Sequence, residues 1–155
     1  MHPNAELIEA FYQAFRAKDA TTMAASYHPE AIFADPVFQL SGFEVGDMWR
    51  MFCARGDDLE VEFSDVTADD ERGSARWEAR YTYSPTGRPV HNRIVASFLF
   101  DGGRISEHRD EFDLAAWAKQ ALGLRGLLLG RTNFIQSRIR AQAATQLERY
   151  RRRAG

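Results

Sequence analysis

The 155-residue sequence contains one cysteine and two lysines, and it has no long apolar run. The single cysteine, Cys53, excludes an internal disulfide and a zinc site built from several cysteines, and it suits a reducing compartment. No apolar run approaches the roughly 18 residues that a membrane-spanning helix needs. The first six residues lack the basic and apolar regions of a signal peptide. We therefore expect a cytoplasmic protein without a membrane partner.

Metal and phosphate motifs are also missing. The four histidines are scattered and show no metal-ligand spacing, so we expect no metal. Gly123, Gly126 and Gly130 lie in a leucine run that lacks the strand, lysine and serine of a phosphate-binding loop. The sequence therefore predicts no cofactor.

The charge is distributed unevenly, although the net charge is only −2. From residue 125 onward there are eight arginines and one acid, a balance of +7, whereas residues 1–124 carry −9. We expect a solvated arginine face on a terminal helix. A basic surface of this kind can also meet phosphate, an acidic lipid surface or another subunit. We expect no exposed aromatic residues to be interleaved with these arginines and therefore no nucleic-acid partner.

Hydrophobic periodicity places the helices early and late in the chain. Apolar residues repeat at helical spacing after Asn4, after Asp19 as far as Tyr27, and over residues 45–53. The pair His28–Pro29 is expected to end the second helix, ahead of a short strand at residues 31–34. Two further helices are expected after Asp113 and over residues 135–150.

Between these helices the period changes to two. Residues 59–64 and 75–83 alternate between apolar and polar side chains, and turn sequences lead from them into two further expected strands, residues 90–100 and 104–112. The order predicts an α+β protein with helices packed on one face of a meander of antiparallel strands. Residues 122–130 are too rich in glycine for a confident helix and too apolar for a free linker. They are expected either to cover a cavity or to pack on another chain.

Three segments resemble the SnoaL-like polyketide cyclase branch of the nuclear transport factor 2-like superfamily. They are residues 27–36 (YHPEAIFADP), 87–93 (GRPVHNR) and 101–113 (DGGRISEHRDEFD). The resemblance covers roughly residues 5–118. It implies a cone, in which a curved antiparallel sheet wraps around the N-terminal helices and a pocket opens at the wide end. We divide the chain into a cone domain, residues 1–121, and an apolar lid segment with a basic helix, residues 122–155.

The superfamily that the sequence resembles also includes ketosteroid isomerases and limonene-epoxide hydrolases. Asp35 matches the general base of the isomerases, but their oxyanion-hole positions correspond to Phe11 and Ala96, which cannot donate hydrogen bonds. The epoxide hydrolases need an arginine and a second aspartate two residues apart. Arg93 can supply the first, but Val95 stands at the place of the second. Neither reaction is therefore expected.

The cyclases and epoxide hydrolases also have a key aspartate in the last long strand, which Asp110 matches. On a strand, His108 and Asp110 share one face. We expect Asp110 to act as base or acid, His108 as its polar partner, Asp35 as an alternative base and Arg93 as a charge partner. The alternatives are a structural Asp110, held by backbone amides or arginines, and an Asp35 that only makes a turn.

Aromatic residues are numerous enough to line a pocket for an apolar or ring-shaped small molecule. The candidates are Tyr27, Phe33, Trp49, Trp77, Tyr81 and Phe98. The competing interpretation is that most of these rings fill the core. The sequence thus favours a small-molecule pocket protein, acting as a cofactor-independent isomerase, cyclase or lyase by proton transfer next to a carbonyl. The alternative is a non-catalytic ligand-binding or dimerising module, and a homodimer is expected in either case.

Overall fold

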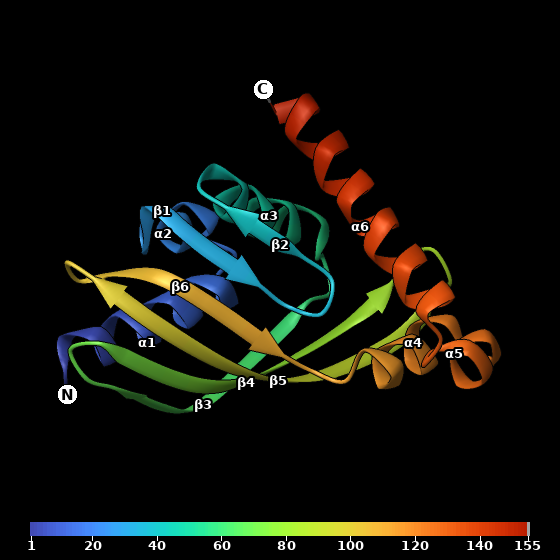
Figure 1. Ribbon diagram of the computed structural model, residues 1–155, viewed down its shortest axis with the longest axis horizontal. Coiled ribbons are helices and arrows are strands. Elements are labelled where there is room, and N and C mark those ends of the chain that lie inside the picture. Colours follow the sequence, from blue (N-terminus) through green and yellow to red (C-terminus); the bar gives the residue numbers. More distant parts are fainter. Residues whose placement is uncertain (155) are drawn as a thin grey trace.

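The computed structural model describes residues 1–154, and its elements follow the predicted order of helices, strands and helices (Figure 1). The helices are α1 (Pro3–Arg16), α2 (Ala20–Ala25), α3 (Phe43–Arg55), α4 (Leu114–Leu122), α5 (Leu124–Leu129) and α6 (Asn133–Ala154). The strands are β1 (Tyr27–Ala34), β2 (Gln39–Ser41), β3 (Glu60–Ala68), β4 (Arg72–Tyr83), β5 (Arg88–Asp101) and β6 (Arg104–Glu111). No helix within residues 1–154 is long and apolar enough to cross a membrane.

The six strands form one curved sheet in the order β2-β1-β6-β5-β4-β3. All neighbouring strands are antiparallel except β1 and β6, which are parallel. Figure 1 shows α1 lying inside the curve of the sheet and α6 running past the opposite, open end. The α+β class, the curved sheet around N-terminal helices and the additional C-terminal helix are therefore confirmed.

The core lies between α1, α3 and the inner face of the sheet. Residues at helical spacing on α1 are fully or almost fully buried: Ile8, Phe11, Tyr12 and Phe15. They meet Met48 and Trp49 of α3 and the inward residues of β4, β5 and β6 in one continuous cluster. The alternation seen in the sequence of the strands is thus the alternation between this core and the outer face of the sheet.

The second helix is shorter than the sequence indicates. It ends at Ala25, and Tyr27 is the first residue of β1. Pro29 lies within β1, although it was expected to stop a helix ahead of the strand. The pairing of β1 with β6 shifts register between Tyr27 and Ile32, and in such a bulge the amide hydrogen that proline lacks is not needed for the ladder. Tyr27 therefore points into the core from a strand rather than from a helix.

The glycine-rich segment forms the short helix α5, packed closely on α4. Gly126 and Gly130 are buried, and a Cβ atom at Gly126 would lie 1.8 Å from the carbonyl oxygen of Ala118. Only glycine permits this approach. Because α5 turns its glycines toward α4, its leucines point away from the protein.

The C-terminal helix α6 docks on α3 through its apolar face. Leu147 is buried, and the Arg151 guanidinium lies 2.9 Å from the Asp47 carboxylate of α3. Arg140 donates to the backbone carbonyl of Pro36 at 2.8 Å. Part of the basic tail is therefore neutralised by the acidic body of the same chain.

The close contact of α5 with α4 makes Gly126 sensitive to substitution. We expect Gly126→Ala to lower the free energy of unfolding by at least about 1–3 kcal/mol, because the new methyl group overlaps backbone atoms that cannot move aside easily. Urea denaturation measures this change. Leu128→Ala, an exposed position on the same helix, should stay within about 0.5 kcal/mol of the wild type. Equal stabilities of the two variants would contradict the packing.

Candidate active site

A cavity of about 310 Å³ lies between the inner face of the sheet, α3 and α6. Its wall is mostly apolar and aromatic, with Trp49, Trp77, Ile94, Phe112 and Trp117 among the lining residues. Two carboxylates, Asp35 and Asp110, also line it. This combination of an apolar wall and a few convergent polar groups is typical of a small-molecule site.

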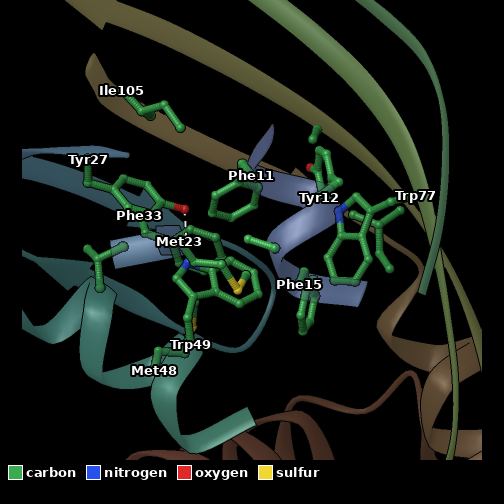
Figure 2. Close-up of a cluster of buried hydrophobic side chains, with 14 of the residues drawn as sticks. Phe11, Tyr12, Phe15, Met23, Tyr27, Phe33, Met48, Trp49, Trp77 and Ile105 are labelled. Carbon is green, nitrogen blue, oxygen red and sulfur yellow. Dashed lines mark hydrogen bonds between the residues drawn. The ribbon is translucent and has the colours of Figure 1, made fainter. Parts of the chain in front are cut away.

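Four buried polar side chains form a continuous chain of hydrogen bonds that ends at the cavity. The indole Nε1 of Trp49 donates to the Tyr27 hydroxyl at 2.9 Å. This hydroxyl lies 2.7 Å from His108 Nδ1, and His108 Nε2 lies 2.8 Å from Asp110 Oδ1. Figure 2 shows the first link, with the Tyr27 hydroxyl pointing at the Trp49 indole. The chain joins α3, β1 and β6.

The hydrogen bonds of this network can donate in one direction only, from Trp49 toward Asp110. The Tyr27 oxygen already accepts from Trp49, so its own hydrogen is free to go to His108 Nδ1. Nδ1 is then an acceptor, which leaves the imidazole proton on Nε2, directed at Asp110. Both ring nitrogens of the fully buried His108 therefore have a hydrogen-bond partner.

Asp110 uses only one of its two oxygens in this network. Its Oδ1 accepts from His108 and, at 3.3 Å, from the indole of Trp77. No hydrogen bond within residues 1–154 reaches Oδ2, and Oδ2 is not among the atoms that are buried without a partner. It follows that Oδ2 is the atom that Asp110 presents to the cavity.

Asp35 divides its oxygens in the same way. Its Oδ1 accepts from the backbone amides of Val37 and Phe38 at 2.7 and 2.6 Å, which closes the turn after β1. The expected turn is therefore present, but the other oxygen remains available on the cavity wall. Burial is the main cause that raises the pKa of Asp35 to about 6; the nearby Asp110 adds to this rise, while the two backbone amides and His108 oppose it.

No arginine of residues 1–154 neutralises either carboxylate. Arg93 lies on the outer face of β5, is 78% exposed and pairs with Glu78 at 3.3 Å. Arg109 likewise pairs with Glu107 on the outer face of β6. Arg93 was expected to be the charge partner of Asp110, but its strand phase directs it away from the cavity. The alternative in which arginines hold Asp110 therefore does not apply to the described residues.

The aromatic candidates separate into two groups. Trp49, Trp77 and Tyr81 line the cavity. Tyr27, Phe33 and Phe98 do not; they pack around the His108 ring, with centroid distances of 6.0, 5.0 and 4.4 Å. Figure 2 shows Trp77 beside Tyr12, and Tyr27 with Phe33 around Trp49. The second group therefore supports the histidine rather than the cavity wall.

Several residues of the site were not indicated by the sequence. Trp117 donates to the Tyr81 hydroxyl at 2.7 Å and closes one side of the cavity. Gln142 and Gln146 line it from α6, whereas no residue of 122–130 does, so α6 occupies the place expected for the lid segment. The sequence shows the helical spacing of the apolar residues of α6, but it does not show which part of the protein this helix packs against.

The Tyr12 hydroxyl was also missed. It is buried without a hydrogen-bond partner within residues 1–154. Burial, with the nearby Asp110 charge, raises the pKa of Tyr12 well above its ordinary value, so this phenol stays protonated.

The SnoaL-like domain model matches residues 8–108, more than half of the sequence. The chain belongs to the SnoaL-like domain family. The match begins at Ile8 within α1 and ends at His108, so Asp35 and Arg93 lie inside it and Asp110 lies just beyond it. No curated protein matches the sequence of this SnoaL-like chain.

Solved structures share the SnoaL-like fold at low sequence identity. An LEH-like epoxide hydrolase of M. tuberculosis is 24% identical and has a TM-score of 0.65, covering 81% of this chain and 92% of its own. IdmH of Streptomyces antibioticus, a proposed polyketide cyclase, is 24% identical with a TM-score of 0.62, covering 79% and 100%. TerC, co-crystallised with polyporic acid, is 19% identical with a TM-score of 0.64, covering 76% and 97%. These similarities establish the cone fold.

The buried hydrogen-bond chain can be tested at its central hydroxyl. Tyr27→Phe removes an acceptor from Trp49 and a donor from His108, so we expect the free energy of unfolding to fall by about 1–3 kcal/mol. Tyr83→Phe is the matched control, because no hydrogen bond to the Tyr83 hydroxyl is present within residues 1–154. Chemical denaturation of both variants gives the comparison. An equal loss in both would contradict a structural role for the Tyr27 hydroxyl.

The raised pKa of Asp35 predicts a pH-dependent stability. A carboxyl with a pKa near 6 in the folded state and 3.8 when unfolded stabilises the fold below about pH 4, and this contribution disappears as the pH rises through about 6. Asp35→Asn keeps an oxygen acceptor for the turn but cannot ionise. We expect the variant to gain about 2 kcal/mol relative to the wild type between pH 4 and 7, measured by urea denaturation. If the free energies of unfolding of the wild type and of Asp35→Asn change with pH in the same way, Asp35 is not desolvated in the folded protein.

Proposed function

We propose that this protein binds an apolar, ring-bearing carbonyl compound and catalyses proton transfer at the carbon next to the carbonyl without a cofactor. The observation that carries this proposal is the free Oδ2 of Asp110, which faces an apolar cavity while Oδ1 is fixed by His108 and Trp77. A carboxylate positioned in this way can take a proton from a carbon atom of a ligand bound in the cavity.

In the proposed reaction, Asp110 Oδ2 removes the proton and the carbon–hydrogen electron pair moves toward the carbonyl oxygen, which gives an enolate. His108 keeps its Nε2 proton, which stays hydrogen-bonded to the other carboxylate oxygen, Oδ1, and holds Asp110 in place, in the manner of a positioning residue. Return of the proton to a different carbon completes an isomerisation. Attack of the enolate carbon on a second carbonyl of the same substrate forms the ring and an alkoxide, and transfer of the proton from Asp110 to this alkoxide completes a cyclisation.

Asp35 supplies the second protonatable group in the same cavity. Because its pKa is about 6, it can hold a proton in weakly acidic solution and donate it to the enolate oxygen, or act as the alternative base when ionised. Two carboxylic acids in different surroundings can divide acid and base roles in this way. The proposal needs no arginine, in agreement with the outward position of Arg93.

The second candidate function is ligand binding without catalysis. It is favoured by Phe11 and Ala96, which are fully buried and apolar at the positions where ketosteroid isomerases place their oxyanion donors. Activity measurements must therefore accompany binding measurements.

A homodimer remains a prediction, and light scattering would measure the molar mass that tests it. The cytoplasmic setting is likewise proposed, supported by the half-buried free thiol of Cys53.

Binding is tested by thermal stabilisation with polyporic acid, the compound in the TerC crystals, and with 2-tetralone, a fused-ring ketone. A ligand that prefers the native state raises its melting temperature. Catalysis is tested by deuterium incorporation at the α-carbon of 2-tetralone in D₂O, followed by mass spectrometry. We expect the wild type to accelerate the exchange above the rate in buffer.

Substitution of the base separates the two candidate functions. Asp110→Asn retains an acceptor for His108 and Trp77 but presents an amide to the cavity, so we expect exchange to fall at least about 100-fold while binding persists. Asp58→Asn is the matched control, an aspartate at the cavity rim bonded to the Thr82 amide, and should exchange like the wild type. Ligand stabilisation without any wild-type exchange would favour the binding module. Unchanged exchange in Asp110→Asn would reject Asp110 as the base.

A further inference from the structure

We propose that α5 and the first turns of α6 form a docking surface for anionic lipid membranes. The surface consists of exposed apolar residues with arginines between them. Its apolar members are Leu124, Leu127, Leu128, Leu129 and Phe134, which are 70%, 58%, 69%, 42% and 65% exposed. Its cationic members are Arg125, Arg131 and Arg138. We call this set the leucine–arginine patch.

The packing of α5 explains why these leucines are exposed. Gly126 and Gly130 occupy the side of α5 that touches α4, at a separation that no other residue allows. Leu124, Leu127 and Leu128 follow the i, i+3, i+4 spacing of the opposite side. The leucines therefore have no packing partner within residues 1–154. A contiguous group of exposed apolar side chains on a protein surface marks an interaction site.

The charge around the patch identifies the kind of partner. Residues 114–147 contain five cationic residues and no acid, whereas the rest of the chain carries a net charge of −7. Within residues 114–147, no acid offsets the attraction of the cationic residues to an anionic surface. Arg138 also lies over the ring of Phe134, 5.6 Å from its centroid, so apolar and cationic groups are side by side. Leucines and an aromatic ring among arginines are typical of interfacial membrane segments.

A second copy of the chain fits this patch less well. In a two-fold symmetric dimer the same patch meets itself, and Arg125, Arg131 and Arg138 of both copies would face one another. A membrane instead accepts the leucines between its headgroups and places phosphates beside the arginines.

The position of the patch also suits an apolar substrate. Trp117 of α4 and the middle of α6 line the cavity, and α5 connects these two helices at the open end of the cone (Figure 1). A protein docked through α5 would hold its cavity mouth near the lipid. The proposal replaces the expectation of no membrane partner, which rested on the absence of a spanning run and did not take account of exposed side chains.

Co-sedimentation of the full chain with vesicles tests the proposal. We expect binding to vesicles of phosphatidylcholine with phosphatidylglycerol and little binding to phosphatidylcholine alone, with affinity falling as salt is added. The double variant Leu127→Ser/Leu128→Ser should weaken binding by about tenfold or more. Arg131→Gln/Arg138→Gln should weaken it by a similar factor and reduce the salt dependence. Phe43→Ser, an exposed apolar position on α3 outside the patch, should bind like the wild type.

The proposal is overturned if the wild type binds neither vesicle type, binds both equally, or is unaffected by the leucine substitutions. A wild-type dimer that the leucine substitutions dissociate, without any vesicle binding, would assign the patch to a second copy instead. The leucines are exposed, so the melting temperature should not change. If the leucine variant nevertheless unfolds, the arginine variant and the salt series still decide the question.

Discussion

The structure depends on the hydrogen bond between His108 and Asp110, which places an ionisable pair inside an aromatic core. Groups of this kind are stable only when their polar atoms find partners, because burial removes them from water. The partners come from four separate elements: Trp49 of α3, Tyr27 of β1, Trp77 of β4 and the pair itself on β6. The network therefore ties α3 to the inner face of the sheet and fixes the direction of one carboxylate oxygen.

The cavity exists because the cone is not filled at its wide end. The narrow part is packed by α1 and its aromatic residues, while the wide part is bordered by α3, α4 and α6. Both carboxylates meet the cavity after satisfying one oxygen within the protein. In each carboxylate one oxygen is held in place and the other is free to contact a ligand, which suits the proton transfer that we propose.

Much of the fold could be predicted because it follows from local patterns. The two-residue period of the strands, the helical spacing of α1 and the capping aspartates Asp19 and Asp113 each depend on nearby residues. The same alternation correctly placed His108 and Asp110 on the inner face of β6. It could not reveal that Arg93 faces outward, because that requires the phase of β5 relative to the core. Nor could it show that Pro29 lies in a bulge, which requires the pairing of β1 with β6.

The sequence by itself determined the fold class, the inward position of the His108–Asp110 pair and the charge contrast between the body and the tail. These features depend on residue type and on spacing along the chain. Only the tertiary structure decided which aspartate oxygens remain free, that α6 rather than α5 lines the cavity, and that the leucines of α5 face solvent. Each of these outcomes depends on contacts between segments distant in sequence, such as Trp77 with Asp110. The leucines are exposed because two glycines allow α5 to approach the backbone of α4.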